Sequence, residues 1–374
     1  MSEKTLKKII NKSLLLQKIF YRSMIDERSL IHKKYAKQVV NIGEILRSTK
    51  PITANVKNKE TLFVGLVKDG SRNNYYTKYE KFLIENNIKY DYYDPDSSSF
   101  IEEAKRFNLI IWRIPDSLPD VSFCKNKIYF IEKELKIMVY PSYKDVWCYE
   151  DKSLEYFLFK NNCFNIIPTF YTNKYSEAQN YIENAKYPIV SKELTSCSSL
   201  GVRLLKNKKT AARFIKKVFG EGNKSSFPWV KQKNYVLFQQ FIPNGNADIR
   251  VVCIGGMYFA GYYRFAKKKD FRASGSGLVE KKEIPEILLH QTKEIYEKLG
   301  LNHMFAVDFL ETTDNQHFII ESSQFIGIET PQQTKKNGVS GIYSYDKVTN
   351  SFVFIEGDYW LQELDLKLLF EEGV

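Results

Sequence analysis

Short runs of β-branched and aromatic residues alternate with helical patterns between residues 61 and 140. Four strands are expected, at Thr61–Val67, Ile88–Tyr93, Leu109–Arg113 and Ile137–Tyr140. Helices are expected between them, at Tyr75–Asn87 and Phe100–Phe107. Strands that alternate with helices favour a parallel sheet covered by helices. The turns after these strands contain no G-x-G-x-x-G motif, so the sequence does not support a dinucleotide site there.

From about residue 145 the pattern becomes a mixture of helices and antiparallel strands. Gly255-Gly256 separates two apolar runs, which is typical of a hairpin. Strands are expected at Tyr187–Ser191, Tyr235–Phe241, Ile249–Ile254, Tyr258–Arg264, Met304–Leu310 and His317–Glu321, and helices at Thr210–Phe219, Pro285–Leu299 and Trp360–Phe370. We therefore predict an α/β and α+β fold with four parts: a basic helical arm at 1–50, a small parallel α/β domain at 60–145, and two subdomains at 146–235 and 236–374.

The positive charge of the chain is concentrated at its start. Residues 1–50 contain twelve Lys or Arg against four Asp or Glu, about two-thirds of the net charge of +12. Such an arm suits an anionic membrane surface, RNA, an acidic protein or polymer, or simply a solvated helix face packed on the α/β domain. Nucleic acid is disfavoured because tyrosines are spread along the whole chain and no RNA-binding signature occurs.

The pattern of cysteines and histidines argues against a disulfide framework and against a histidine-bound metal. The five cysteines are scattered without a C-x-x-C pair, and the four histidines lack the spacing of helical metal ligands. No apolar run approaches the roughly 20 residues of a membrane-spanning helix. We expect a protein of the reducing cytoplasm, with contact at the inner membrane surface through the arm as the open alternative.

Two lysines occupy positions suited to phosphate. Lys152 follows Asp151 at the start of a helix, and Lys192 ends the apolar strand YPIVSK. The small-residue loop Thr195–Val202 comes next, and its backbone N–H groups can closely approach phosphate oxygens. A solvated lysine at a strand end is the alternative.

Two carboxylates lie in apolar strands. Asp308 is within MFAVDFL and Glu321 ends HFIIES, so adjacent strands would bring them together. Hard oxygen ligands suit Mg²⁺ shared with nucleotide phosphates, whereas the alternative is a pair of buried acids each bridged to Lys or Arg. Three arginines, Arg250, Arg264 and Arg272, fall in one hairpin-and-loop region, where guanidinium groups suit a phosphate or carboxylate.

Taken in order, these segments resemble the ATP-grasp superfamily. The segments are Asp151-Lys152, YPIVSK with its loop, VLFQQFIPNGNADIRV, YYRFAKKKDFRASGSG and AVDFL…FIIESS. The resemblance covers roughly residues 140–330. It is strongest to carboxylate–amine ligases related to ribosomal-protein glutamyl ligases, cyanophycin synthetase and glutathione synthetase. It implies an ATP-grasp fold preceded by the small α/β domain and the helical arm.

The resemblance also implies nucleotide-binding residues. Lys152 and Lys192 would contact the ATP phosphates. The segment with Gln240, Phe241 and Ile242 would meet the adenine, and Asp248 would bind the ribose. Gln240 stands where family members usually carry an acidic residue.

Catalytic and metal-binding roles follow from the same resemblance. Arg250, Arg264 and Arg272 would stabilise the transferred phosphoryl group, and Asp308, Glu321 and Ser323 would hold Mg²⁺. The last position usually carries Asn, a stronger ligand than the Ser323 hydroxyl.

The resemblance implies an ATP- and Mg²⁺-dependent ligase that joins a carboxylate to an amine through an acyl phosphate, in peptide, polysaccharide or secondary-metabolite modification. A carboxylate substrate and an amine acceptor are the expected partners, and related ligases are often homo-oligomers. Two alternatives stay open. One is a kinase that phosphorylates a hydroxyl or an acid, and the other is a degenerate protein that binds a nucleotide or polyanion without catalysis.

Overall fold

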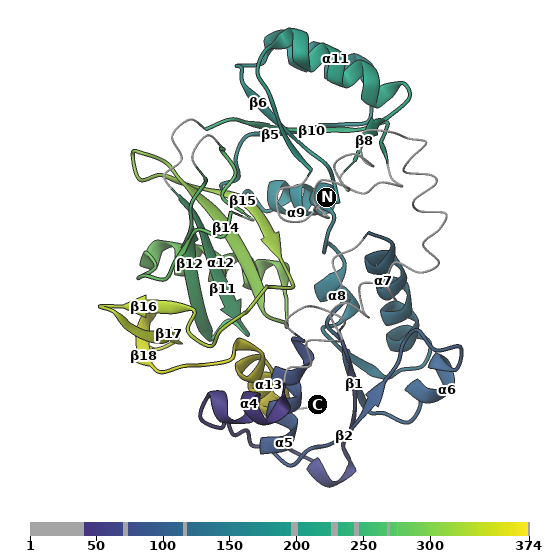
Figure 1. Cartoon of the computed structure of the whole chain (residues 1–374), viewed down its shortest axis with the longest axis vertical. Helices are drawn as coiled ribbons and strands as arrows, with labels where there is room; N and C mark the ends of the chain where they lie inside the picture. Colours follow the sequence, from purple (N-terminus) through teal and green to yellow (C-terminus); the bar gives the residue numbers. More distant parts are fainter. Residues whose placement is uncertain are drawn as a thin grey trace, which may run out of the picture.

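The computed structural model describes residues 41–69, 74–114, 118–195, 201–225, 231–242, 247–267, 270–274 and 276–372. The molecule has three parts, and each part is built on its own sheet (Figure 1). Residues 1–40 of the expected arm lie outside the described residues, and its described end forms helix α4, Ile42–Ser48. Within the described ranges, no helix is both long and apolar enough to cross a lipid bilayer.

The first part is a parallel sheet in the order β2-β1-β3-β4. Its strands agree with the predicted ones: β1 Phe63–Val67, β2 Lys89–Tyr93, β3 Leu109–Ile111 and β4 Met138–Tyr140. A 3-10 turn at Lys59–Thr61 precedes it, and its helices are α5 Tyr76–Glu85, α6 Phe100–Ala104, α7 Leu118–Lys133 and α8 Tyr143–Val146. Helix α7 is not among the predicted elements. Its buried residues nevertheless recur at helical spacing, as Val121, Cys124, Ile128 and Ile131.

The second part is a small antiparallel sheet in the order β5-β10-β6-β7. The strands are β5 Thr169–Thr172, β6 Ile189–Lys192, β7 Val202–Leu205 and β10 Val236–Gln240, with the short pair β8 Asn223–Lys224 and β9 Lys231–Gln232 beside them. Helices α10 Tyr175–Asn184 and α11 Lys208–Phe219 pack against it.

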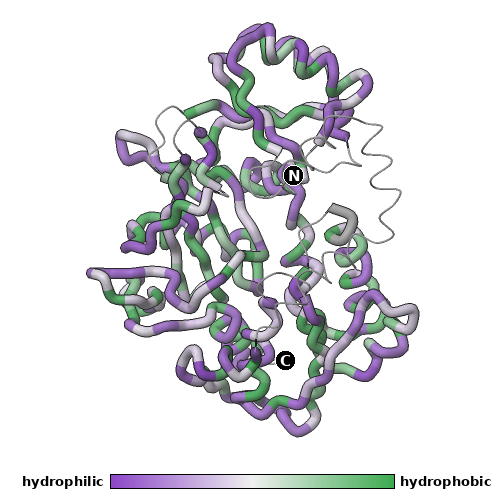
Figure 2. The backbone as a smooth tube through the Cα atoms, in the orientation of Figure 1, coloured by the Kyte–Doolittle hydropathy of each residue, from purple (hydrophilic) through white to green (hydrophobic). Residues whose placement is uncertain are grey.

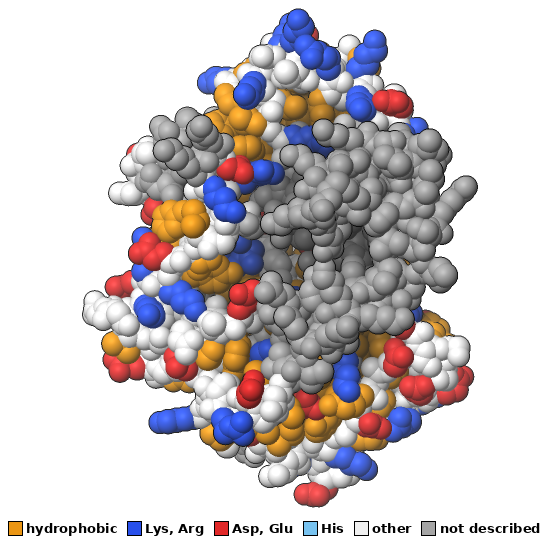
Figure 3. Space-filling model, in the orientation of Figure 1, with side chains coloured by type: hydrophobic (Ala, Val, Ile, Leu, Met, Phe, Trp, Pro, Cys, Tyr) orange, Lys and Arg blue, Asp and Glu red, His pale blue; other side chains and the backbone are white. Residues whose placement is uncertain are grey.

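Helix α11 shows why this layer is stable. Its apolar side, with Phe214 and Ile215, is buried in the same core as Phe238 of β10. Hydrophilic and hydrophobic residues alternate along it (Figure 2). Its other side carries the lysines and arginine that gather at the top of the molecule (Figure 3). This amphipathic pattern places the helix between the sheet and solvent.

The third part is a large antiparallel sheet in the order β15-β14-β11-β12-β17-β16, with β13 on β12 and β18 on β17. Its strands are β11 Ala247–Ile254, β12 Tyr258–Arg264, β13 Val279–Glu280, β14 Phe305–Glu311, β15 His317–Ser323, β16 Thr334–Lys336, β17 Val339–Asp346 and β18 Ser351–Glu356. Helix α12, Glu286–Leu299, packs on β11 and β14. The predicted hairpin is present, since Gly255 and Gly256 have φ of 58° and 68°. Strands β16 to β18 are not among the predicted elements.

The last helix, α13 (Leu361–Glu372), returns to the first part and packs against α5. Leu366 and Phe370 share a buried cluster with residues of β1 and α5. Lys81 of α5 and Glu363 of α13 form a buried ion pair at 2.8 Å. The predicted α/β and α+β fold is therefore confirmed, with the C-terminal helix joined to the α/β domain, and the predicted domain limits stay predictions.

Candidate active site

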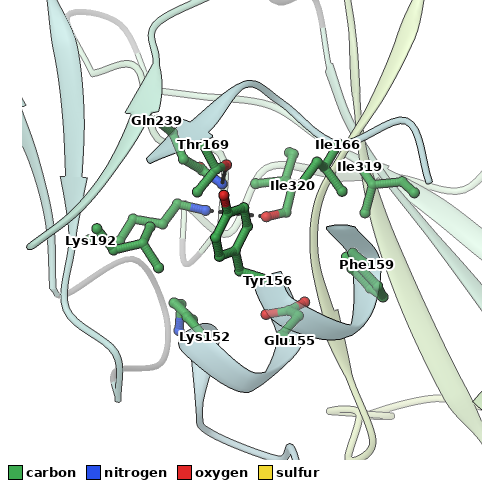
Figure 4. Close-up of a pocket in the computed structure, with 11 residues that line it drawn as sticks. Lys152, Glu155, Tyr156, Phe159, Ile166, Thr169, Lys192, Gln239, Ile319 and Ile320 are labelled. Carbon is green, nitrogen blue, oxygen red and sulfur yellow. Dashed lines mark hydrogen bonds between the residues drawn. The ribbon is translucent and has the colours of Figure 1, made fainter. Parts of the chain in front are cut away.

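Lys152 and Lys192 line one pocket between the small and the large antiparallel sheets (Figure 4). Lys192 is the last residue of β6, and Lys152 is the first residue of α9, Lys152–Asn161. Asp151 caps α9 by accepting from the backbone N–H groups of Ser153 and Leu154, at 3.0 and 3.2 Å. The backbone N–H of Lys152 also donates to Leu194 O at 3.0 Å, which joins the start of α9 to the end of β6. The pocket is lined by Lys152, Glu155, Tyr156, Phe159, Ile166, Thr169, Lys192, Leu237, Gln239, Ile319 and Ile320.

The ammonium group of Lys192 is buried beside the end of β15. Its Nζ lies 4.0 Å from Oε2 of Glu321 and donates to Ile320 O at 3.4 Å. Burial lowers the pKa of Lys192, because the charged form loses water, while the carboxylate of Glu321 opposes that shift.

Glu155 is a third charged residue of the pocket and was not predicted from the sequence. Its carboxylate accepts the backbone N–H of Ser322 in β15, so α9 is tied to the strand that carries Glu321. Burial raises the pKa of Glu155 to about 8, and Glu321 adds to the rise while Lys152 opposes it. The sequence could have indicated Glu155 as a site residue, because it lies three residues after Lys152 and residues three apart are neighbours on a helix surface.

Asp308 and Glu321 are register partners in β14 and β15, so the structure brings the two predicted carboxylates together. The ladder is irregular immediately after this pair, between Asp308 and Phe309. Cross-strand partners project from the same face of a sheet, and Glu321 faces Lys192 from there.

Asp308 is neutralised by two arginines. Arg250 on β11 donates two hydrogen bonds of 2.7 Å to its oxygens, and Arg264 on β12 lies 2.6 Å from Oδ2. Burial alone would raise the pKa of Asp308, but the two guanidinium groups outweigh it and hold the pKa well below its usual range. Asp308 is thus bridged by two arginines in this structure, and its expected role as a metal ligand stays a prediction.

Asp248 belongs to the same network. It is buried, and both of its oxygens accept from Nη2 of Arg264, at 2.6 and 2.7 Å. Burial raises the pKa of Asp248 to about 6, with Arg264 opposing the shift. Its contact in this structure is thus an arginine, and its expected ribose role stays a prediction.

The other predicted site residues lie at the edges of the site. Arg272 does not join the pair formed by Arg250 and Arg264, because it forms its ion pair with Asp270 in its own loop at 2.9 Å. The Ser323 hydroxyl donates to Phe325 O at 2.7 Å. Gln240 is the last residue of β10, and Phe241 and Ile242 follow it. Most of the expected phosphate loop, residues 196–200, lies outside the described residues.

Comparisons with known proteins identify a family and a fold for this part of the chain. A model of the RimK-like ATP-grasp domain matches residues 150–340, which contain every predicted site residue. Similar solved structures include a D-alanine–D-alanine ligase from Bacillus anthracis, with 16% identity and a TM-score of 0.52 over 73% of this chain and 90% of that one. A D-cycloserine synthetase has 14% identity and a TM-score of 0.51 over 70% and 91% of the two chains.

A RimK-domain ATP-grasp protein from Sphaerobacter thermophilus is also similar, with 16% identity and a TM-score of 0.50 over 71% of this chain and 92% of that one. A sequence search of curated proteins gave no match. At these identities the solved structures show the fold alone, and the family match covers half of the chain. The chain belongs to the RimK-like ATP-grasp family.

Proposed function

We propose that the protein is an ATP- and Mg²⁺-dependent ligase that forms an amide from a carboxylate and an amine. The observation that carries this proposal is that Lys152 and Lys192 face one pocket, with Glu321 beside Lys192 and Asp308 paired to Glu321. Two cations, of which Lys192 is buried, next to two carboxylates suit a nucleotide whose phosphates arrive with a metal ion. The family and the ligases among the similar structures support the same reaction class.

The two carboxylates, Asp308 and Glu321, match the number of protein carboxylates that Mg²⁺ commonly takes in phosphoryl-transfer sites. The described residues contain no group of three or more His, Cys, Asp or Glu able to hold a metal by themselves. Mg²⁺ in phosphoryl-transfer sites commonly takes one or two carboxylates and completes its shell with phosphate oxygens and water. Glu321 and Asp308 would hold it, and it would neutralise charge on the transferred phosphate.

The residues of the chain would act by position and charge. Lys192 and Lys152 would bind the phosphates and keep the γ-phosphoryl group aligned with the substrate carboxylate. A carboxylate oxygen then attacks the γ-phosphorus, ADP leaves, and an acyl phosphate forms. The amine attacks the acyl carbon, phosphate leaves, and the amine loses a proton to give the amide. Arg250 and Arg264 would set the position and the ionised state of Asp308 during these steps.

The test is a screen for ADP release from Mg²⁺-ATP over pools of acids and amines, with Lys192→Ala and Glu321→Ala as blanks. ADP release that needs both an acid and an amine, and that disappears in the blanks, supports the ligase. A stable phosphorylated product formed without an amine would instead identify a kinase. Full ADP release in either blank would contradict the proposed site.

A second candidate is a nucleotide-binding protein without catalysis. It is favoured by the contacts of two predicted metal ligands, since Asp308 is bridged by two arginines and the Ser323 hydroxyl is bonded to Phe325. This candidate predicts nucleotide binding with no ADP release for any pair of acid and amine.

A further inference from the structure

Two cations of the α/β domain lie outside the nucleotide pocket, at the carboxyl edge of the parallel sheet. Arg113 follows β3 by two residues, and Lys78 lies in the first turn of α5, which follows β1. The sheet order β2-β1-β3-β4 reverses direction between β1 and β3. Open α/β sheets bind ligands outside the carboxyl ends of their strands at such a switch point. The two cations therefore stand where the topology favours a ligand.

Arg113 lies between aromatic rings from two different parts of the molecule. Its guanidinium carbon is 4.1 Å from the ring centroid of Tyr75 and 5.8 Å from that of Phe325. Tyr75 precedes α5, whereas Phe325 comes just after β15, four residues beyond Glu321. A Cβ built on Gly327 would stand 3.3 Å from the Tyr75 hydroxyl, so the two parts also meet beside the arginine. Arg113 thus lies at the junction between the α/β domain and the strand that carries the predicted metal ligands.

The charge of Arg113 is not balanced in the way that the other site arginines are. Arg250 and Arg264 are each bonded to a buried aspartate. Within the described ranges, Arg113 forms no ion pair with a carboxylate. Because the aspartates already engage Arg250 and Arg264, Arg113 is the better receptor for a negative group of a substrate.

Lys78 adds to the positive charge behind Arg113. It is 3% exposed, and its Nζ lies 5.8 Å from the Tyr75 ring centroid, on the same ring that Arg113 covers. Burial lowers the pKa of Lys78 to about 8, Asp69 opposes the shift, and Arg113 lowers the pKa further.

We propose that Arg113, supported by Lys78, binds a second carboxylate of the acid substrate, remote from the one that is activated, so that the substrate is a dicarboxylic acid. The proposal rests on the proposed function for the site around Glu321. A guanidinium held between rings keeps its planar N–H edge for two parallel hydrogen bonds to a carboxylate. The four residues from Glu321 to Phe325 span at most about 13 Å of extended chain, so one acid of moderate length can reach both ends of the site.

The test is calorimetric titration of the full chain, loaded with Mg²⁺-ADP, with two matched series of acids. The probes are the straight-chain dicarboxylates from succinate to suberate and the monocarboxylates of the same lengths. At least one dicarboxylate is expected to bind tenfold or more tightly than its monocarboxylate partner. Arg113→Gln removes this preference, and Arg113→Lys, which keeps the charge without the planar fork, restores part of it.

Arg106→Gln is the matched control, because Arg106 also lies over aromatic rings of the same domain but already has an acidic partner, Asp91, at 2.6 Å. The control keeps the preference for dicarboxylates. The proposal is overturned if no dicarboxylate is preferred by the unmodified chain, or if Arg113→Gln retains the preference.

Two further readouts separate this proposal from the ligase function. Mg²⁺-ADP binding is measured for each Arg113 variant and is expected to be unchanged, which also shows that the variants are folded. If dicarboxylates are preferred but no amine leads to ADP release, the ligase function is contradicted and the carboxylate-binding role of Arg113 is retained. If monocarboxylates lead to ADP release and Arg113→Gln does not change it, the ligase function is supported and the role of Arg113 is contradicted.

Discussion

Lys192, the last residue of β6, lies 4.0 Å from Glu321 of β15, so one ion pair connects the small antiparallel sheet to the large one. Lys192 lines the pocket that also contains Lys152 and Glu155, and Glu321 lies beside it. A ligand that binds Lys192 or Glu321 would therefore weaken the ion pair that connects the two sheets. If Lys192 binds nucleotide phosphate as proposed, nucleotide binding is expected to change the contact between these two sheets.

Replacing Lys192 by Ala is expected to weaken Mg²⁺-ATP binding by about tenfold to a hundredfold, because a charged hydrogen bond contributes about 1.5–3 kcal/mol. The measurement is calorimetric titration with Mg²⁺-ATP. Lys174→Ala is the control, since that lysine is exposed and paired only at the surface with Glu177 at 3.1 Å. Equal affinity in the two variants would rule out a phosphate role for Lys192.

Replacing Arg250 by Gln is expected to lower the free energy of unfolding by about 3–5 kcal/mol, because it leaves the buried carboxylate of Asp308 with half of its compensation. Urea denaturation measures the change. Arg106→Gln breaks an exposed pair and should cost no more than about 1 kcal/mol. A loss for Arg250→Gln as small as that of the control would show that Asp308 does not depend on the arginine.

Glu363 is expected to make stability depend on pH. Burial raises the pKa of Glu363 to about 7 although Lys81 opposes the shift, whereas the carboxyl of the unfolded chain titrates near its ordinary value of 4.5. The folded state therefore binds more protons between pH 4.5 and about 7. The contribution of this residue to stability is complete below pH 4.5 and is lost as the pH rises through 7.

The measurement is urea denaturation of the native chain and of Glu363→Gln at several pH values between 4 and 8. The stability difference between them is expected to change across this window, with the native chain losing more as the pH rises. Glu371→Gln on the same helix, where Glu371 pairs with Lys367, is the control. Parallel curves for all three proteins would contradict the assignment.

Tyr140→Phe is expected to destabilise the fold by about 1.5–3 kcal/mol, because the buried carboxylate of Asp365 loses a hydrogen bond of 2.7 Å from the phenol. The same carboxylate lies 2.6 Å from Nδ1 of His303. The cluster joins β4, α13 and the segment before β14. Thermal or urea unfolding gives the change, and Tyr129→Phe at an exposed position should have no measurable effect.

The strands that carry the site could be predicted from the sequence because their composition is unambiguous. MFAVDFL and HFIIES are apolar runs that favour strands, and consecutive strands usually pair, so Asp308 and Glu321 were expected to meet. Lys192 was located in the same way, at the polar end of an apolar run.

Contacts set by register could not be predicted. Arg250 faces Asp308, and Asp248 faces Arg264, only because of how β11 aligns with its two neighbours. A shift of one residue would have moved each side chain to the other face of the sheet. Arg272 looks equivalent to the other arginines in the sequence, yet its loop position gives it a local partner instead.

Other elements were missed because their sequence signals are weak. Helix α7 begins with Leu118 and Pro119, and it carries exposed aromatic residues, Phe123 and Tyr129, beside its buried ones. The sequence therefore shows no clear separation of an apolar from a polar face. The hairpin of β17 and β18 keeps exposed apolar residues such as Val353, so it lacks a clean alternation of buried and exposed positions.

The packing of α13 on α5 has a consequence for how the molecule is made. Leu366 and Phe370 complete an apolar cluster that includes Val64 and Phe82. A ribosome synthesises Val64 and Phe82 long before Leu366 and Phe370, and domains generally begin to fold from the N-terminal side. The α/β domain must therefore wait, with part of its interior open to water, until helix α13 has emerged.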